Sequence, residues 1–256
     1  MPGSVWPDRS IEVQRVGGVP FARVGPDDAA SWLERAASEG DPISVRLANA
    51  YCVALASRDD DYRQVLCGSG VNFADGSPVA WVMSRKLKLG DRKAYLVRGP
   101  SLFVRLLEGS SLKHFFIGAT EETLAQIERR FTDVGASGTV AGSYAPPFAP
   151  VTDELIADLA RRVQSSDAEV VWVGMGTPKQ DLVTTSLAAQ VGMPCVGVGA
   201  AFDFYAGRTV EAPAVLQGSG LEWLYRFVRE PRRLFRRYTT GNAYFLAAVA
   251  RHWGDD

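Results

Sequence analysis

Three polar residues stand directly behind a pair of glycines in the second half of the chain. Gly174 and Gly176 end a short apolar run, and Thr177, Lys179 and Gln180 follow them. The run predicts a buried strand, and the apolar periodicity after the turn predicts a helix. Free backbone N–H groups and the helix dipole make such a helix start a suitable place for an anion. The P-loop spacing is absent, and Lys179 occupies the position of the third glycine of a dinucleotide fingerprint.

A fourth polar residue belongs to the same unit. Residues 195–198 predict a second buried strand, which runs into another glycine turn and Asp203. Strand, helix and strand in this order form a βαβ unit, so both turns lie at the same edge of a parallel sheet. A purely structural turn is the alternative interpretation. The gathering of hydroxyl, ammonium, carboxamide and carboxylate groups favours a binding site.

Asp75 is the carboxylate that best suits general-base chemistry. It precedes Gly76 in a predicted turn, and residues 79–89 after it predict a helix. A turn or N-cap aspartate is the structural alternative. Histidine is a poor competitor for the role, because the chain has only His114, which leads into a predicted strand, and His252, near the C-terminus.

The run Asp59-Asp60-Asp61 formally fits the Asp-x-Asp metal motif of many nucleotide-sugar transferases. Its surroundings are wholly polar, and no predicted strand precedes it to aim the carboxylates. We interpret it as a solvated turn after a helix. The sequence therefore predicts no metal site and no cofactor.

The segment 221–240 is basic and aromatic. It holds six arginines against two glutamates, interleaved with large apolar side chains, and Pro231 divides it into two predicted helices. Cationic residues beside apolar ones suit an anionic membrane surface. A solvated helix face packed on the core is the alternative. Residues 242–253 add an apolar tail that is too short to span a bilayer.

Composition limits the remaining possibilities. The chain has 256 residues, is 46% hydrophobic and carries a net charge of −1, which gives no drive toward nucleic acid. Cys52, Cys67 and Cys195 have no paired spacing, so neither a disulfide framework nor a zinc site is expected, and a reducing compartment fits. No signal peptide and no membrane span are predicted.

Several ordered motifs resemble one family of enzymes. The stretches GMGTPKQD, GVGAAFDFYAG and EAPAVLQGSGLEWLYRFVREPRRLFRRY, together with the Asp-Gly turn, are similar to the WecG/TagA/CpsF glycosyltransferases. The resemblance covers most of residues 43–238. It implies inverting transfer of a sugar from a UDP-sugar to an acceptor sugar on a polyprenyl diphosphate, in bacterial surface polysaccharide or cell-wall polymer synthesis. The implied transferase is of the hexosyl or N-acetylhexosaminyl type.

The resemblance also implies roles for particular residues. Asp75 would be the base, and the other catalytic positions are Gln180, Arg233 and Arg236. The expected binding positions are Asn49, Gly76, Gly174, Gly176, Thr177, Lys179, Asp203, Arg226 and Arg237. Two positions depart from the family pattern, since Leu47 replaces a threonine and Ser101 replaces an aspartate. Ser101 retains the ability to cap a helix over 102–107 but brings no charge.

The expected fold is α/β, with a Rossmann-like, mainly parallel sheet, flanking helices and a basic amphipathic C-terminal appendage. Residues 1–215 would form the catalytic core, in two βαβ-type halves that meet near 145–150, and residues 216–256 the membrane-associating appendage. Further strands are expected over 42–47, 112–117 and 140–142, and helices over 27–39, 49–56, 121–131 and 152–163.

These expectations place the protein in the cytoplasm, at the inner face of the plasma membrane. Its oligomeric state stays open, a homo-oligomer included. Two other function classes also stay open. A nicotinamide-dependent oxidoreductase would use a similar turn, but with the full glycine fingerprint and an acidic residue roughly 20 residues further on. A non-catalytic protein that binds lipid surfaces would need the basic tail alone.

Overall fold

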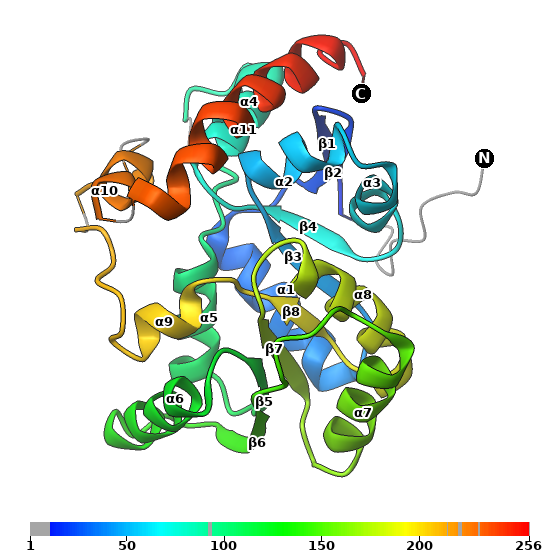
Figure 1. Ribbon diagram of the computed structural model, residues 1–256, viewed down its shortest axis with the longest axis vertical. Helices are drawn as coiled ribbons and strands as arrows, with labels where there is room; N and C mark the ends of the chain where they lie inside the picture. The colour runs from blue at the N-terminus through cyan, green and yellow to red at the C-terminus, as the bar shows by residue number, and fades with distance from the viewer. Residues whose placement is uncertain (1–10, 92–93, 214, 220–221, 230, 256) are drawn as a thin grey trace.

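The computed structural model describes most of the chain (Figure 1). The described residues are 11–91, 94–213, 215–219, 222–229 and 231–255, and of residues 223, 226 and 231–239 the backbone alone is described.

A six-stranded, all-parallel sheet forms the centre of the molecule. Its strands, in spatial order, are β4 (Val71–Ala74), β3 (Ser44–Ala48), β8 (Cys195–Gly197), β7 (Val170–Gly174), β5 (Lys113–Gly118) and β6 (Thr139–Tyr144). The four residues 170–173 of β7 are all buried, as a strand covered on both faces requires. The pairing of β5 with β6 shifts register once, between His114 and Phe115.

Helices cover both faces of the sheet. The apolar core on one face includes α1 (Pro26–Glu39), α5 (Gly99–Gly109), α6 (Glu121–Asp133) and α9 (Ala201–Tyr205). The core on the other face includes α7 (Asp153–Gln164) and α8 (Lys179–Val191). This arrangement confirms the predicted α/β fold with a parallel sheet and flanking helices.

A third apolar cluster lies at the top of Figure 1. It joins the antiparallel hairpin β1 (Val13–Val16) and β2 (Val19–Ala22) to α2 (Ala50–Ala56), α3 (Asp60–Cys67), α4 (Ser77–Lys86) and α11 (Pro231–Arg251). Phe245, Ala248 and Val249 of α11 are buried in it beside Val53 of α2. The C-terminal half of α11, beyond the basic segment, is therefore packed on the core.

Side-chain caps explain where several helices begin. Asn49 accepts a hydrogen bond from the Tyr51 N–H at the start of α2, and Thr120 and Thr152 cap α6 and α7 in the same way. Each cap satisfies an N–H group that the helix itself leaves unpaired.

Some local expectations were wrong. The run at 59–61 is not a turn but the start of α3, where the Asp59 carboxylate accepts from the Tyr62 N–H. Ser101 is not a cap, because α5 begins earlier, with Arg98 as its N-cap residue. The turn after β8 continues into the short helix α9. These segments lack the apolar periodicity that identifies a longer helix.

Pro231 divides the basic segment as expected, with α10 (Glu222–Arg229) before it and α11 beginning at it. The second helix runs on to Arg251, through the residues expected to form a separate apolar tail. The division of the chain at 215 and near 145–150 stays a prediction. Among the described residues, no helix is both long and apolar enough to cross a bilayer.

Candidate active site

The predicted site residues follow neighbouring strands at the carboxyl edge of the sheet. Asp75 follows β4, Asn49 follows β3, and Gly174 ends β7. The turn of Gly199, two residues after β8, leads to the predicted residue Asp203 in α9. These four strands are consecutive in the sheet. The fold thus brings together polar groups from distant parts of the sequence, as expected for the turns of a parallel sheet.

Connections near β8 leave the sheet toward opposite faces. The helices after β3 and β7, α2 and α8, pack on one side, whereas α9 after β8 packs on the other. In open α/β sheets, ligands bind outside the strand ends where neighbouring connections diverge in this way. The edge between β3, β8 and β7 is therefore the expected ligand position.

Asp75 is fixed through both its backbone and its side chain. Its N–H donates to the Ala48 carbonyl at 2.9 Å, and its Oδ1 accepts from the Gly99 N–H at 3.1 Å. The residue is half-buried. Gly76 has a φ of 90°, a left-handed conformation that favours glycine. The Asp-Gly pair thus places a carboxylate in a defined orientation at the end of β4.

Asn49 and Thr177 share a neighbour. The Cys52 sulfur lies 3.6 Å from Asn49 Oδ1 and 3.9 Å from Thr177 Oγ1. Asn49 comes directly after Ala48, the residue whose carbonyl holds the Asp75 N–H. Three of the predicted site residues therefore lie in one continuous group.

Gln180 joins two glycine turns. Its Oε1 accepts from the Gly176 N–H at 3.1 Å and from the Gly199 N–H at 3.0 Å, and the residue is 2% exposed. The first turn follows β7 and the second follows β8. The Gly176 N–H, expected to be free for an anion, is therefore already paired within the protein.

Lys179 and Asp203 lie in different surroundings from the group of Asp75, Asn49 and Thr177. Lys179 Nζ donates to the Ala149 carbonyl at 2.5 Å and lies 5.6 Å from the centre of the Phe148 ring. It thus reaches the loop between β6 and α7. Asp203 is half-buried in α9. The structure gives neither residue a contact with Asp75.

The arginines of the tail are placed by backbone alone. Arg226 lies in α10, and Arg233, Arg236 and Arg237 lie in α11. Their side chains are outside the described part of the structure. Their predicted roles thus rest on the resemblance of the motif.

A buried charged network lies behind the site. Arg46 of β3 is fully buried and donates to Asn72 Oδ1 at 2.8 Å and to the Ser69 carbonyl at 2.9 Å. Burial lowers the pKa of Arg46 to about 10, and the Asp181 carboxylate opposes that shift. Arg46 therefore stays charged at neutral pH. Tyr62 donates to Asp181 Oδ2 at 2.7 Å, so the network ties α3 to α8 beside Gln180.

Sequence reasoning did not identify this network or the contacts of Arg98. Both join residues that are far apart in the chain, such as Arg46 with Asp181 and Arg98 with Glu222. A charged residue inside a predicted strand was the one available signal for Arg46. Nothing in the sequence pairs Arg98 with its partners.

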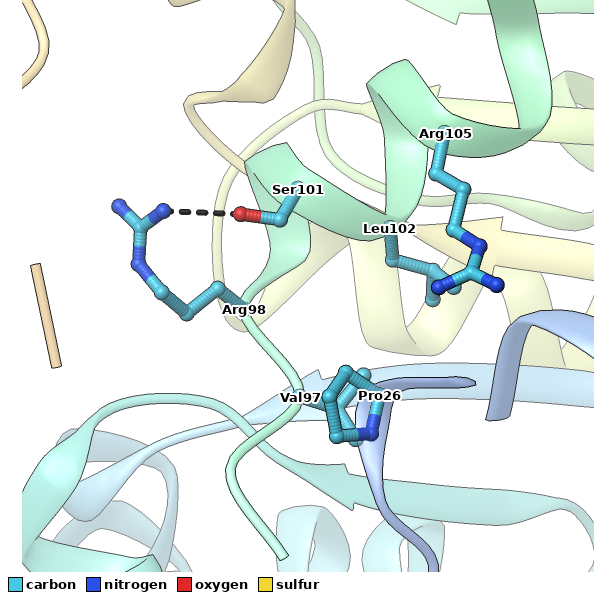
Figure 2. Close-up of a pocket in the computed structure, with 6 residues that line it drawn as sticks. All are labelled: Pro26, Val97, Arg98, Ser101, Leu102 and Arg105. Carbon is cyan, nitrogen blue, oxygen red and sulfur yellow. Dashed lines mark hydrogen bonds between the residues drawn. The ribbon is translucent and has the colours of Figure 1, made fainter. Parts of the chain in front are cut away.

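Two hollows do not have Asp75 among their lining residues. One of about 80 Å³ is lined by the starts of α1 and α5, and Figure 2 shows Arg98 and Arg105 on opposite sides of Leu102 there. The other, of about 270 Å³, is open and lies between α6 and β6. Ligand pockets for small molecules usually measure about 300–1,000 Å³. Neither hollow therefore accounts for a complete sugar-nucleotide site.

The sequence model of the glycosyl transferase WecG/TagA/CpsF family matches residues 14–255, nearly the whole chain. The chain belongs to this family. Membership of the WecG/TagA/CpsF family confirms the resemblance and supports glycosyl transfer, with a sugar donor and an acceptor as substrates. It favours a transferase over both the oxidoreductase and the non-catalytic lipid-binding protein.

Proposed function

We propose that the protein is an inverting glycosyltransferase that moves a sugar from a UDP-sugar to an acceptor sugar carried on a polyprenyl diphosphate. The transferred group would be a hexosyl or N-acetylhexosaminyl residue. The product would serve bacterial surface polysaccharide or cell-wall polymer synthesis. Family membership supports the transfer, and the motifs of the chain support this donor and this acceptor.

The observation that carries the proposal is the fixed carboxylate of Asp75. Inverting transfer is one displacement at the anomeric carbon, in which the acceptor hydroxyl attacks and loses its proton. A base must receive that proton from a defined direction. Oδ1 of Asp75 is held by the Gly99 N–H at the ligand-binding edge of the sheet. Asn49 and Thr177, which both contact Cys52, follow β3 and β7 at the same edge and would offer polar groups to a sugar.

The leaving group is a nucleotide diphosphate, and its growing negative charge needs stabilisation. Gln180 orders the two glycine turns that border the donor position. Arg233 and Arg236 of α11, with Arg226 and Arg237 as binding residues, supply the cations in this proposal. Guanidinium groups suit phosphate oxygens because they donate two parallel hydrogen bonds.

A polyprenyl-linked acceptor places the reaction at a membrane. Leu224 and Val228 lie four residues apart on α10 and are 44% and 72% exposed. Apolar side chains on a helix rich in arginine suit the boundary between headgroups and acyl chains. We therefore propose peripheral association with an anionic membrane at its cytoplasmic face.

Asp75→Asn tests the central step. The amide keeps the shape of the side chain but cannot take a proton, so we expect turnover to fall about 100-fold or more. Donor binding, followed by thermal shift with UDP-sugars, should stay unchanged. Asp59→Asn is the matched control, because asparagine also caps α3. Turnover of the Asp75 variant within a few-fold of the wild type would exclude the proposed base.

A further inference from the structure

Arg98 uses every N–H donor of its guanidinium group. Nε and one terminal nitrogen bind the two carboxylate oxygens of Glu222, at 3.3 and 2.9 Å. The same terminal nitrogen binds Glu211 at 2.6 Å, and the other binds Gln217 and Ser101, each at 2.9 Å. These contacts match the five donors of arginine. The side chain is 11% exposed, so it is largely shielded from water.

Two of these partners, Glu211 and Gln217, belong to the segment between α9 and α10. The described residues from 207 to 219 form neither a helix nor a strand. Val210 and Val215 are exposed, and Ala212 is buried. Among its described residues, polar contacts with Arg98 therefore contribute to the attachment of this segment, beside the hydrogen bonds from Arg208 to Thr120 and Thr123.

A third partner is the first residue of α10. Glu222 begins that helix, and its Oε2 also accepts from the Gly218 N–H at 3.4 Å. Arg98 thus fixes the point from which α10 and α11 extend. The proposed cationic positions of the tail lie on these two helices.

The residue that follows Arg98 contacts the proposed base. The Gly99 N–H donates to Asp75 Oδ1, as described above, and a side chain on Gly99 would meet Leu47 and Val198 at 3.5–3.6 Å. The two ends of one dipeptide therefore hold different parts of the site. The Arg98 side chain holds the tail, and the Gly99 backbone holds the carboxylate.

We propose that Arg98 is a positioning residue that docks the 207–222 segment and thereby sets the tail helices against the Asp75 carboxylate. This inference rests on the proposed function. Arg98 itself touches no reacting atom. It acts through Glu211, Gln217 and Glu222 on one side and through the Gly99 peptide on the other.

Charge explains why the docking depends on arginine. Glu211 and Glu222 both lie within 3 Å of one guanidinium nitrogen. Without the cation, two carboxylates would face each other in a poorly hydrated place, and their repulsion would favour release of the segment. Lysine is a poor replacement, because its ammonium group lacks the planar fork.

The experiment compares Arg98→Gln, Arg98→Lys and Glu222→Gln with Arg105→Gln. Arg105 is the matched control, since it lies on the helix that follows Arg98 and pairs with an aspartate, Asp27, but is half-exposed. The readouts are kcat and KM for transfer to a soluble acceptor analogue and hydrogen exchange of residues 207–229. A swapped pair, Arg98→Glu with Glu222→Arg, tests rescue.

We expect Arg98→Gln to lose exchange protection over 207–229 while the sheet keeps its protection. Its kcat should fall roughly 10- to 100-fold, because catalytic groups are misplaced rather than removed. The KM for the donor should stay within about threefold. Arg98→Lys and Glu222→Gln should show smaller losses, the swapped pair should recover most of the kcat, and Arg105→Gln should match the wild type.

Normal kcat in Arg98→Gln with a released segment would overturn the positioning role, since docking would then be only structural. Unchanged exchange over 207–229 would overturn the docking itself. If Arg98→Gln does not fold, Glu222→Gln decides by the same two readouts. A wild type that transfers no sugar would refute the proposed function instead, and the exchange measurement would still decide the docking.

Discussion

The carboxamide oxygen of Gln180 accepts two N–H groups that belong to separate turns. Gln180→Leu removes that acceptor and leaves both glycine N–H groups without it. We expect a loss of about 1–3 kcal/mol in the free energy of unfolding, measured by urea denaturation. Gln190→Leu, on the exposed end of the same helix, is the control and should change stability by less than about 0.5 kcal/mol.

Gln180→Glu separates the structural role from the catalytic one. A carboxylate can still accept both N–H groups, so stability should stay closer to the wild type than in Gln180→Leu. Its negative charge should weaken the binding of a diphosphate donor. Equal donor affinity in Gln180→Glu and the wild type would show that Gln180 does not lie at the site where the donor binds.

His114 gives a prediction for the pH dependence of stability. Its Nδ1 accepts from the Trp172 indole N–H at 3.0 Å, and burial lowers the pKa of His114 to about 4. As the pH falls below about 6.5, the unfolded chain takes up a proton that the native protein refuses until about pH 4. Stability should therefore decrease over this range, by on the order of 2 kcal/mol.

The measurement is the unfolding free energy of wild type and His114→Gln between pH 7 and pH 4. Glutamine keeps an acceptor for Trp172 but cannot titrate. The variant should therefore lack this part of the decrease. Parallel profiles for the two proteins would show that other groups cause the acid sensitivity.

At the scale of the elements, α10 is the proposed membrane contact. The double change Leu224→Gln and Val228→Gln removes two exposed apolar side chains among the described ones of this helix. We expect co-sedimentation with anionic vesicles to weaken about tenfold or more, with transfer to a soluble acceptor analogue unchanged. Val134→Gln, an exposed valine after α6, is the control and should bind vesicles like the wild type.

Changes at the tail arginines should affect sugar transfer more than vesicle binding, the reverse of the changes in α10. Arg233→Ala or Arg236→Ala should keep most vesicle binding, because several other arginines remain. Each should depress transfer strongly, and lysine should restore only part of it. Normal transfer by both alanine variants to the soluble analogue would make the tail a membrane contact only.

The central βαβ unit was the part that the sequence predicted best. The strand, helix and strand predicted around the glycine turn at 174–176 match β7, α8 and β8 closely. Two helices escaped, because α3 begins in a polar run and α9 has only five residues. For the site, the resemblance of the motifs named Asp75 and Asn49 as site residues, and the fold places both at one edge of the sheet. The sequence could not show that the Gly176 N–H donates to Gln180 Oε1, since that hydrogen bond depends on side-chain packing.

At the scale of the whole molecule, α11 connects the tail to the core. Phe245 is buried, whereas its neighbour Leu246 is 64% exposed. Phe245→Ala should cost about 3–5 kcal/mol of unfolding free energy, and Leu246→Ala less than about 1 kcal/mol. Equal effects would mean that this half of α11 is not docked.

The same packing changes how membrane binding should be tested. A truncation after Gly220 removes α10 but also Phe245, Ala248 and Val249 from the core. Lost vesicle binding in such a truncation would therefore report unfolding as well as a missing contact. The point changes in α10 avoid this ambiguity.

The position of α11 also has a consequence for biosynthesis. On the ribosome, α11 is made after every strand of the sheet, yet it covers residues of α2, which is made near the beginning. In the nascent chain, Val53 and its apolar neighbours therefore stay partly exposed until α11 has been translated. Exposed apolar surface of this kind is what chaperones bind and what drives aggregation. A ribosome stalled before α11 should consequently carry a chain that recruits chaperones, and release of that chain should yield insoluble protein.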